Sequence, residues 1–195
     1  VGDVLHTANV GDSRAVLCSK GVATALTVDH KPEDEKELAR ITAAGGVVDF
    51  GGVVAPGGGN FLKCARSLGD VQYKQGPRER HLITAEPELF RQTLTDDDEF
   101  VVMASDGVWD VFDDQKACDI AAKALKDHNG AAHIAAREVV MRAYQAESED
   151  NLCAAVLLLA RRPSKGGSRA PAATSSAQPT ADTTSATTNS AADSA

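Results

Sequence analysis

The sequence predicts an α+β fold, in which antiparallel strands form the core and helices pack outside them. Short apolar runs bounded by turn residues, typical of strands, occur near the start, the middle and the end of the first 160 residues. Longer segments whose apolar residues lie three or four apart, typical of helices, alternate with them. The chain has 195 residues, of which 43% are hydrophobic, and this is enough for one sizeable core.

The first part of the chain predicts two strands and a helix. Residues 4–10 and 15–18 are apolar runs separated by the turn signal of residues 11–14, which we interpret as a hairpin. The acidic run after Pro32 suits a helix N-terminus, where negative charge meets the helix dipole. Apolar residues keep helical spacing from there to Gly45 and the glycine after it, which end the helix.

The second part repeats the alternation. Asp113 or Asp114 is placed to cap a helix that runs towards Gly130, because aspartate oxygens accept hydrogen bonds from free N–H groups at helix starts. The remaining expected elements are extended segments at 47–48, 82–85, 88–90, 100–103 and 152–159, and a second helix at 131–146.

Acidic residues stand at the ends of three expected strands. Asp106 follows the buried run 100–103, and Asp110 comes one helical turn later on the same side. Asp150 precedes the run 152–159, and Asp12 follows the first strand. If the strands 100–103 and 152–159 are antiparallel neighbours, Asp106 and Asp150 meet at one sheet edge. Converging carboxylates suit Mg²⁺ or Mn²⁺, although Asp106, Asp110 and Asp12 are also ordinary cap or turn residues.

Five short motifs occur in a fixed order along the chain. Together they resemble the C-terminal part of the catalytic domain of a metal-dependent serine/threonine protein phosphatase of type 2C, over the chain up to about Arg162. The resemblance implies a four-layer α-β-β-α sandwich of two antiparallel sheets flanked by helices, incomplete at the N-terminus. The motifs are GDSR (11–14), DHKP (29–32), RSLGD (66–70), SDGVWD (105–110) and EDN (149–151).

The resemblance also implies a chemistry. Type 2C phosphatases hydrolyse phosphoserine and phosphothreonine with a water activated at a centre of two Mg²⁺ or Mn²⁺ ions. Asp106 and Asp150 match carboxylates of that centre, and Asp12 and Asp110 match positions that, with Asp106, hold a weaker third ion. The chain departs from the family at Glu147, where glycine or serine is usual, and at LKCAR (62–66), where LAVSR is common.

Other family features do not occur in the sequence. The DGHGG element, whose histidine is the expected general acid, is absent, and no arginine matches the one that binds substrate phosphate. His30 belongs to a structural turn, so we assign no catalytic residue. We therefore expect a fragment that binds metal poorly and is inactive alone. The alternative is a non-catalytic pseudophosphatase that acts as a binding or regulatory module.

Several remaining segments receive structural interpretations. We expect Arg66 and Asp70 to hold the base of the family's variable flap by charge-assisted bonds, and Trp109 to anchor the core. The glycine run 57–59 lacks the GKS or GKT ending of a P-loop, so we read it as flexible flap sequence near the substrate.

Composition limits the possible binding partners and cellular compartments of the protein. The net charge of −8 argues against nucleic-acid binding through a basic face, and no stretch is long and apolar enough for a membrane span. The four cysteines form no CxxC pair, which favours free thiols in a reducing compartment. We expect a monomer in the cytoplasm or nucleus that acts on phosphoproteins. Residues 1–162 form the catalytic-domain portion, and the Ala/Ser/Thr-rich tail 163–195 is expected to be disordered.

Overall fold

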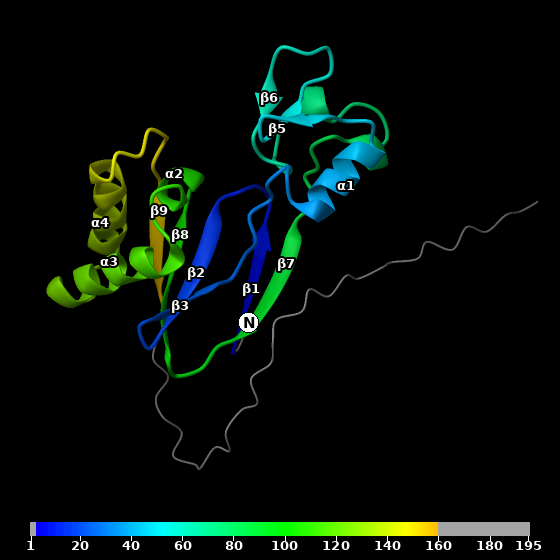
Figure 1. Ribbon diagram of the computed structural model, residues 1–195. Helices are drawn as coiled ribbons and strands as arrows, with labels where there is room; N and C mark the ends of the chain where they lie inside the picture. Colours follow the sequence, from blue (N-terminus) through cyan, green and yellow to red (C-terminus); the bar gives the residue numbers. More distant parts are fainter. Residues whose placement is uncertain (1–2, 160–195) are drawn as a thin grey trace, which may run out of the picture.

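The computed structural model describes residues 3–159 and combines helices with antiparallel sheets (Figure 1). The expected tail 163–195 lies outside the described residues. The strands are β1 (Val4–Asn9), β2 (Arg14–Ser19), β3 (Val22–Ala25), β4 (Val48–Asp49), β5 (Gly52–Val54), β6 (Phe61–Leu62), β7 (Glu88–Thr93), β8 (Asp98–Ala104) and β9 (Ala154–Leu158). The α-helices are α1 (Glu35–Ala43), α2 (Asp106–Trp109), α3 (Asp114–Asp127) and α4 (Ala132–Gln145), and the 3₁₀ turns are Val71–Tyr73 and Arg78–Arg80.

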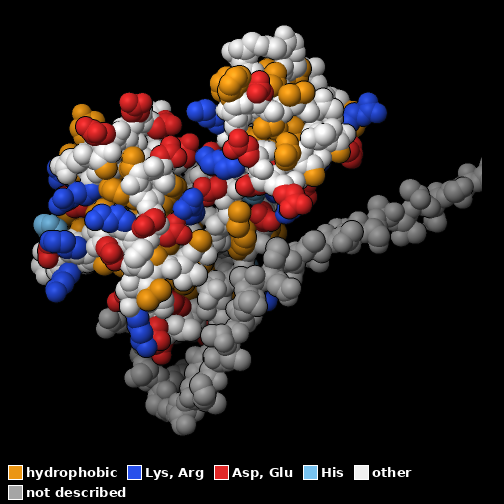
Figure 2. All heavy atoms as spheres, in the orientation of Figure 1, with side chains coloured by type: hydrophobic (Ala, Val, Ile, Leu, Met, Phe, Trp, Pro, Cys, Tyr) orange, Lys and Arg blue, Asp and Glu red, His pale blue; other side chains and the backbone are white. Residues whose placement is uncertain are grey.

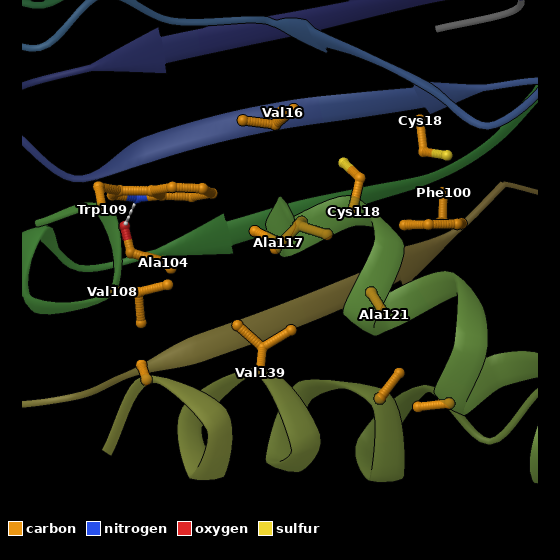
Figure 3. Close-up of a cluster of buried hydrophobic side chains, with 14 residues drawn as sticks. Val16, Cys18, Phe100, Ala104, Val108, Trp109, Ala117, Cys118, Ala121 and Val139 are labelled. Atoms are coloured by element: carbon orange, nitrogen blue, oxygen red, sulfur yellow. Dashed lines mark hydrogen bonds between the residues drawn. The ribbon is translucent and has the colours of Figure 1, made fainter. Parts of the chain in front are cut away.

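The principal sheet has the order β3-β2-β8-β9, and all its pairs are antiparallel. Ala104 at the end of β8 pairs with Ala154 at the start of β9, which confirms the expected neighbourhood of these two strands. Helices α3 and α4 cover one face of this sheet (Figure 1). Val16 and Val139 are fully buried in the core between the helices and this sheet (Figure 3). Val102 of β8 is fully buried in the same core.

The centre of β2 is buried on both of its faces. Val16 and Cys18 join the core under the helices, whereas Ala15 and Leu17 point to the opposite face. There, Leu5 of β1 packs against the second cluster. A strand with two apolar faces requires a layer on each side, and the β1–β7 ribbon contributes to the second one. The complete four-layer sandwich remains an expectation from the resemblance.

The hairpin expected around residues 11–14 is wrong. Strand β1 pairs with β7, and β2 pairs with β3 and β8, so the segment between β1 and β2 passes from one sheet to the other. A Gly-Asp turn signal is local and reports a change of direction. The partner of each strand depends on side-chain packing between distant segments, which the turn sequence does not encode.

Helix α1 and strands β4, β5 and β6 form a separate lobe beyond the ends of β1 and β7 (Figure 1). Its own small core contains Ile41, Val53, Tyr73 and Ile83. The helix predicted after Pro32 is confirmed, with acidic residues in its first turn and the left-handed Gly45 (φ 84°) just after its end. We call this region, residues 35–83, the flap lobe.

The helix predictions in the second half are also confirmed. Of the two candidate caps, Asp113 is the N-cap of α3, and its carboxylate accepts a 2.7 Å hydrogen bond from the Lys116 N–H. Trp109 is the expected core anchor: it is only 8% exposed, and its indole N–H donates to the Ala104 carbonyl at 2.8 Å (Figure 3). No helix between residues 3 and 159 has the length and apolarity needed to cross a lipid bilayer.

Candidate metal centre

The end of β8 and the segment before β9 are joined through Ser105. The Ser105 hydroxyl donates to the Asn151 carbonyl at 3.0 Å and accepts from the Cys153 N–H at 3.1 Å. The Ser105 N–H also donates to the Cys153 carbonyl at 3.0 Å. These bonds extend the β8–β9 pairing beyond its last strand residues, so the acidic segments at the two strand ends are held side by side.

Gly107 allows this approach because it has no side chain. A Cβ atom at this position would lie 2.8 Å from the Asn151 carbonyl oxygen and 3.1 Å from the Asp150 Cβ. The Gly107 carbonyl also accepts a 2.7 Å hydrogen bond from the Ser148 hydroxyl. The first turn of α2 is thereby pressed against the residues that carry Asp150, which explains why glycine follows Asp106.

The pKa of Asp106 is affected by the acids of both neighbouring segments. Burial raises the pKa of its carboxyl above the ordinary value, and the charges of Asp12 and Asp150 raise it further. The Gly107 N–H, 3.0 Å from Asp106 Oδ1, and the Lys31 charge act in the opposite direction. Asp12, Asp106 and Asp150 thus lie within one electrostatic neighbourhood, as their positions at strand ends predict.

Asp12 is already paired with a cation. Lys31 Nζ lies 2.6 Å from Asp12 Oδ2, and the Asp12 side chain is only 18% exposed. The ammonium comes from the segment before α1, which also carries the buried His30. The sequence pattern did not reveal this pair, because nothing in the spacing of Asp12 and Lys31 indicates that their segments meet.

Asp110 directly follows the last residue of α2. Its N–H donates to the Asp106 carbonyl at 2.8 Å, so the two acids are one helical turn apart as predicted. Its carboxylate is exposed, and Asp12 and Asp150 are the carboxylates with the largest effects on the pKa of Asp106. Asp110 and Asp150 are therefore the exposed members of the acidic group, and Asp12 and Asp106 are half-buried.

The donor chemistry of this group suits a hard divalent ion, because its side chains offer carboxylate oxygens. Within residues 3–159, no three Asp, Glu, His or Cys side chains converge closely enough to hold an ion by themselves. The Lys31 ammonium beside Asp12 shows that the site favours positive charge. Acidic and basic side chains gather between the sheet and the flap lobe in Figure 2.

Arg14, the last residue of the GDSR motif, stabilises one wall of this site through contacts that the sequence does not predict. Its guanidinium binds Asp29 through two hydrogen bonds of 2.9 and 2.7 Å and reaches Asp114 at 2.6 Å. It also lies 5.2 Å from the centre of the Trp109 ring. These hydrogen bonds hold the pKa of Arg14 above its ordinary value. One side chain therefore connects β2, the segment before α1 and the start of α3.

A second arginine fixes the base of the flap lobe, as the sequence predicts. Arg66 Nε donates to Glu37 Oε1 at 2.9 Å, and Arg66 Nη1 donates to the Glu86 carbonyl at 3.0 Å. Arg40 binds the other Glu37 oxygen at 3.0 Å. Asp70, which was expected to act similarly, has a left-handed backbone (φ 48°), and its side chain makes no capping hydrogen bond.

His30 has the structural position expected for it. Its ring is buried, and Nδ1 lies 3.1 Å from the Gly11 nitrogen and 2.9 Å from the Gly11 carbonyl oxygen. Burial and the Arg66 charge lower the pKa of the ring. With Nδ1 against the Gly11 backbone and Nε2 3.4 Å from Glu88 Oε2, the ring positions the segment beside Asp12.

Known proteins resemble this chain over most of its length. The family model "Protein phosphatase 2C" matches residues 1–152. The chain belongs to the protein phosphatase 2C family. Among its relatives, "Protein phosphatase 2C homolog 3" of Schizosaccharomyces pombe is 46% identical over 127 residues, which cover 64% of this chain. "Probable protein phosphatase 2C 2" of rice is 40% identical over 156 residues, which cover 80% of this chain.

A solved structure of a phosphatase shares this fold. The crystal structure of a phosphatase from Toxoplasma gondii aligns with a TM-score of 0.71 and 29% identity, covering 82% of this chain and 49% of that one. The matched regions cover 30% and 40% of the two protein phosphatase 2C relatives. The chain therefore spans less than half the length of these two relatives.

Proposed function

We propose that this chain is part of a protein serine/threonine phosphatase that hydrolyses phosphoserine and phosphothreonine at a centre of two Mg²⁺ or Mn²⁺ ions. The observation that carries the proposal is the close approach of Gly107 to Asn151, which brings Asp106 beside Asp150. Membership of the protein phosphatase 2C family supports it. Phosphoproteins are the substrates, and we keep the expectations of a monomer in the cytoplasm or nucleus.

In this proposal each acid has a defined task. Asp106 and Asp150 are ligands of the two-ion centre, and Asp12 and Asp110 join Asp106 at a weaker third position. Bound divalent ions supply an activated water and neutralise phosphate oxygens. The chain's own residues hold the ligands: Ser105 and Ser148 fasten the strand ends.

The chain alone is proposed to be inactive. It contains no DGHGG element and no residue that we assign to bind the substrate phosphate or to protonate the leaving group. Its two proposed ligands of the two-ion centre, Asp106 and Asp150, would amount to half a site. A complete catalytic domain would supply the remaining ligands.

A second candidate is a non-catalytic relative that uses the fold as a binding or regulatory module. The observation that favours it is the ammonium of Lys31 on Asp12, because a neutralised carboxylate has less need of an ion. Burial and the charges of Asp12 and Asp150 raise the pKa of Asp106, and this favours the enzyme, because a bound divalent ion stabilises a carboxylate in such surroundings.

One comparison separates these candidates. The upstream half of the domain is attached to this chain, and Mn²⁺-dependent hydrolysis of a phosphothreonine peptide is measured for the extended and the present chain. We expect turnover in the extended chain alone. A folded extended chain without turnover would contradict the enzyme and favour the module, and turnover by the present chain would contradict the half-site proposal.

A further inference from the structure

Lys31 is a cation that the fold places inside the acidic group. Its Nζ lies 2.6 Å from Asp12 Oδ2. The charges of Asp106 and Asp29 also stabilise the ammonium and, with Asp12, hold the pKa of Lys31 above its ordinary value although burial alone would lower it. One positive charge thus faces Asp12 and Asp106, two of the carboxylates proposed for the weaker ion position.

The segments that carry Asp12 and Lys31 are held together by their neighbours. The His30 N–H donates to the Gly11 carbonyl at 3.1 Å, and the His30 ring contacts the Gly11 nitrogen and carbonyl oxygen. The His30 carbonyl accepts a 2.7 Å hydrogen bond from the Ala65 N–H. Because Gly11 and His30 directly precede Asp12 and Lys31, the backbones of the pair are kept in register.

The Lys31 ammonium can nevertheless move away from Asp12 into solvent. The Lys31 side chain is 38% exposed, whereas that of Asp12 is 18% exposed. A lysine has a flexible stem and a single compact charge, so its head group can move into water while its backbone stays fixed. Asp12 has no comparable freedom, because its segment is fastened to His30.

We propose that Lys31 is a tethered competitor of the divalent ion at Asp12 and Asp106, and that it sets the ion concentration at which this position fills. The proposal rests on the proposed function, since it deepens the role of the weaker third position. A divalent ion that binds Asp12 must first displace the ammonium, and this lowers its apparent affinity. Lys31 would therefore make this position responsive to the level of free Mg²⁺ or Mn²⁺.

The test uses binding to the present chain, which carries all the carboxylates of this position. Mn²⁺ is titrated into the chain, and free Mn²⁺ is followed by electron paramagnetic resonance. The Lys31→Gln variant should bind Mn²⁺ about tenfold more tightly, the equivalent of removing one charge-assisted bond from the competition. Asp12→Asn in the Lys31→Gln background should remove this gain.

Two control variants isolate the competition. Lys31→Arg keeps a competing charge, and Lys36→Gln removes an exposed positive charge that pairs with Glu88, outside the acidic group. Both should bind Mn²⁺ within about twofold of the unmodified chain, because neither frees Asp12. Lys31→Met, which keeps the apolar part of the stem, repeats the comparison if circular dichroism shows that Lys31→Gln is unfolded.

The proposal is overturned if neutral variants at Lys31 bind Mn²⁺ no more tightly than the unmodified chain. Weaker binding in these variants would show that Lys31 holds Asp12 in place instead of competing with the ion. If no variant binds Mn²⁺ in the millimolar range, the proposed ion position at Asp12 and Asp106 does not exist. None of these results depends on hydrolysis. If the folded extended chain shows no turnover while Lys31→Gln binds Mn²⁺ more tightly, the proposed function is contradicted and the proposal for Lys31 still holds.

Discussion

Gly107 and Asn151 are so close that a Cβ on Gly107 would lie 2.8 Å from the Asn151 carbonyl oxygen. A Cβ atom does not come this close to a backbone oxygen, so any other residue at position 107 would push the two strand ends apart. The contact joins the turn that carries Asp106 to the segment that carries Asp150. The acidic group therefore depends on a backbone contact as much as on the acids themselves.

Gly107→Ala should destabilise the chain by about 1–3 kcal/mol, because the added methyl group forces backbone shifts in a packed site. Urea unfolding followed by Trp109 fluorescence measures this. The pKa of Asp106 should also fall towards its ordinary value as Asp150 moves away, which NMR titration of the carboxyl would detect. An unchanged unfolding midpoint would show that the two segments separate without cost.

Arg14→Gln should cost about 2 kcal/mol of unfolding free energy, since it removes charge-assisted bonds to Asp29 and Asp114 and leaves both acids without a partner. Arg14→Lys should recover part of the loss, because lysine keeps the charge and lacks the planar fork. Arg91→Gln, at an exposed position on β7, is the matched control and should be close to neutral. Equal stabilities for the glutamine variants would refute the bracing role of Arg14.

Glu37 should make stability depend on pH below about 4.5. Burial alone would raise its pKa, but the hydrogen bonds and charges of Arg66 and Arg40 lower it below the ordinary 4.5. A carboxyl whose pKa is lower in the folded state contributes stability above its unfolded pKa. That contribution is lost as the pH falls through 4.5 towards the folded value.

Glu37→Gln should therefore flatten the dependence of unfolding free energy on pH in the acid range, in addition to destabilising the chain by about 3 kcal/mol at neutral pH. Glu35→Gln, an exposed neighbour on the same helix, should keep the full slope. Urea unfolding at several pH values compares them. If the slope survives in Glu37→Gln, another group is responsible for it.

Glu147→Gly should stabilise the chain by up to about 1 kcal/mol. Glu147 has a left-handed backbone (φ 62°), which costs a residue with a side chain about 1–2 kcal/mol and costs glycine little. This conformation suits glycine, which is one of the two residues, glycine and serine, that the resemblance implies at this position. Glu149→Gly, two residues away and without a positive φ, should be neutral or destabilising in the same thermal unfolding assay.

Much of the fold follows from local patterns. Apolar periodicity directly reflects which face of an element is buried, so it predicts strands β8 and β9 and helices α1, α3 and α4. It also predicts the antiparallel contact that brings Asp106 towards Asp150. The pairing of β1 with β7 was not predictable in this way, since the intervening elements must first fold to bring them together.

The candidate site shows the same division. Acids at strand ends mark where Asp12, Asp106 and Asp150 gather, because strand order places them at one edge. Lys31 and the Arg14 contacts with Asp114 come from segments whose meeting depends on the folded backbone, so no spacing rule identifies them. The exposure of Asp110 likewise depends on what packs beside α2.

The measurement that tests the central claim most directly compares two variants of the extended chain, Asp106→Asn and Asp96→Asn, in Mn²⁺-dependent hydrolysis of a phosphothreonine peptide. Asp96 is an exposed acid between β7 and β8. We predict that Asp106→Asn lowers kcat/KM more than about a hundredfold, beyond the loss typical of residues that only support metal ligands, and that Asp96→Asn leaves it unchanged. Equal activity in the two folded variants would contradict the assignment of Asp106 to the metal centre.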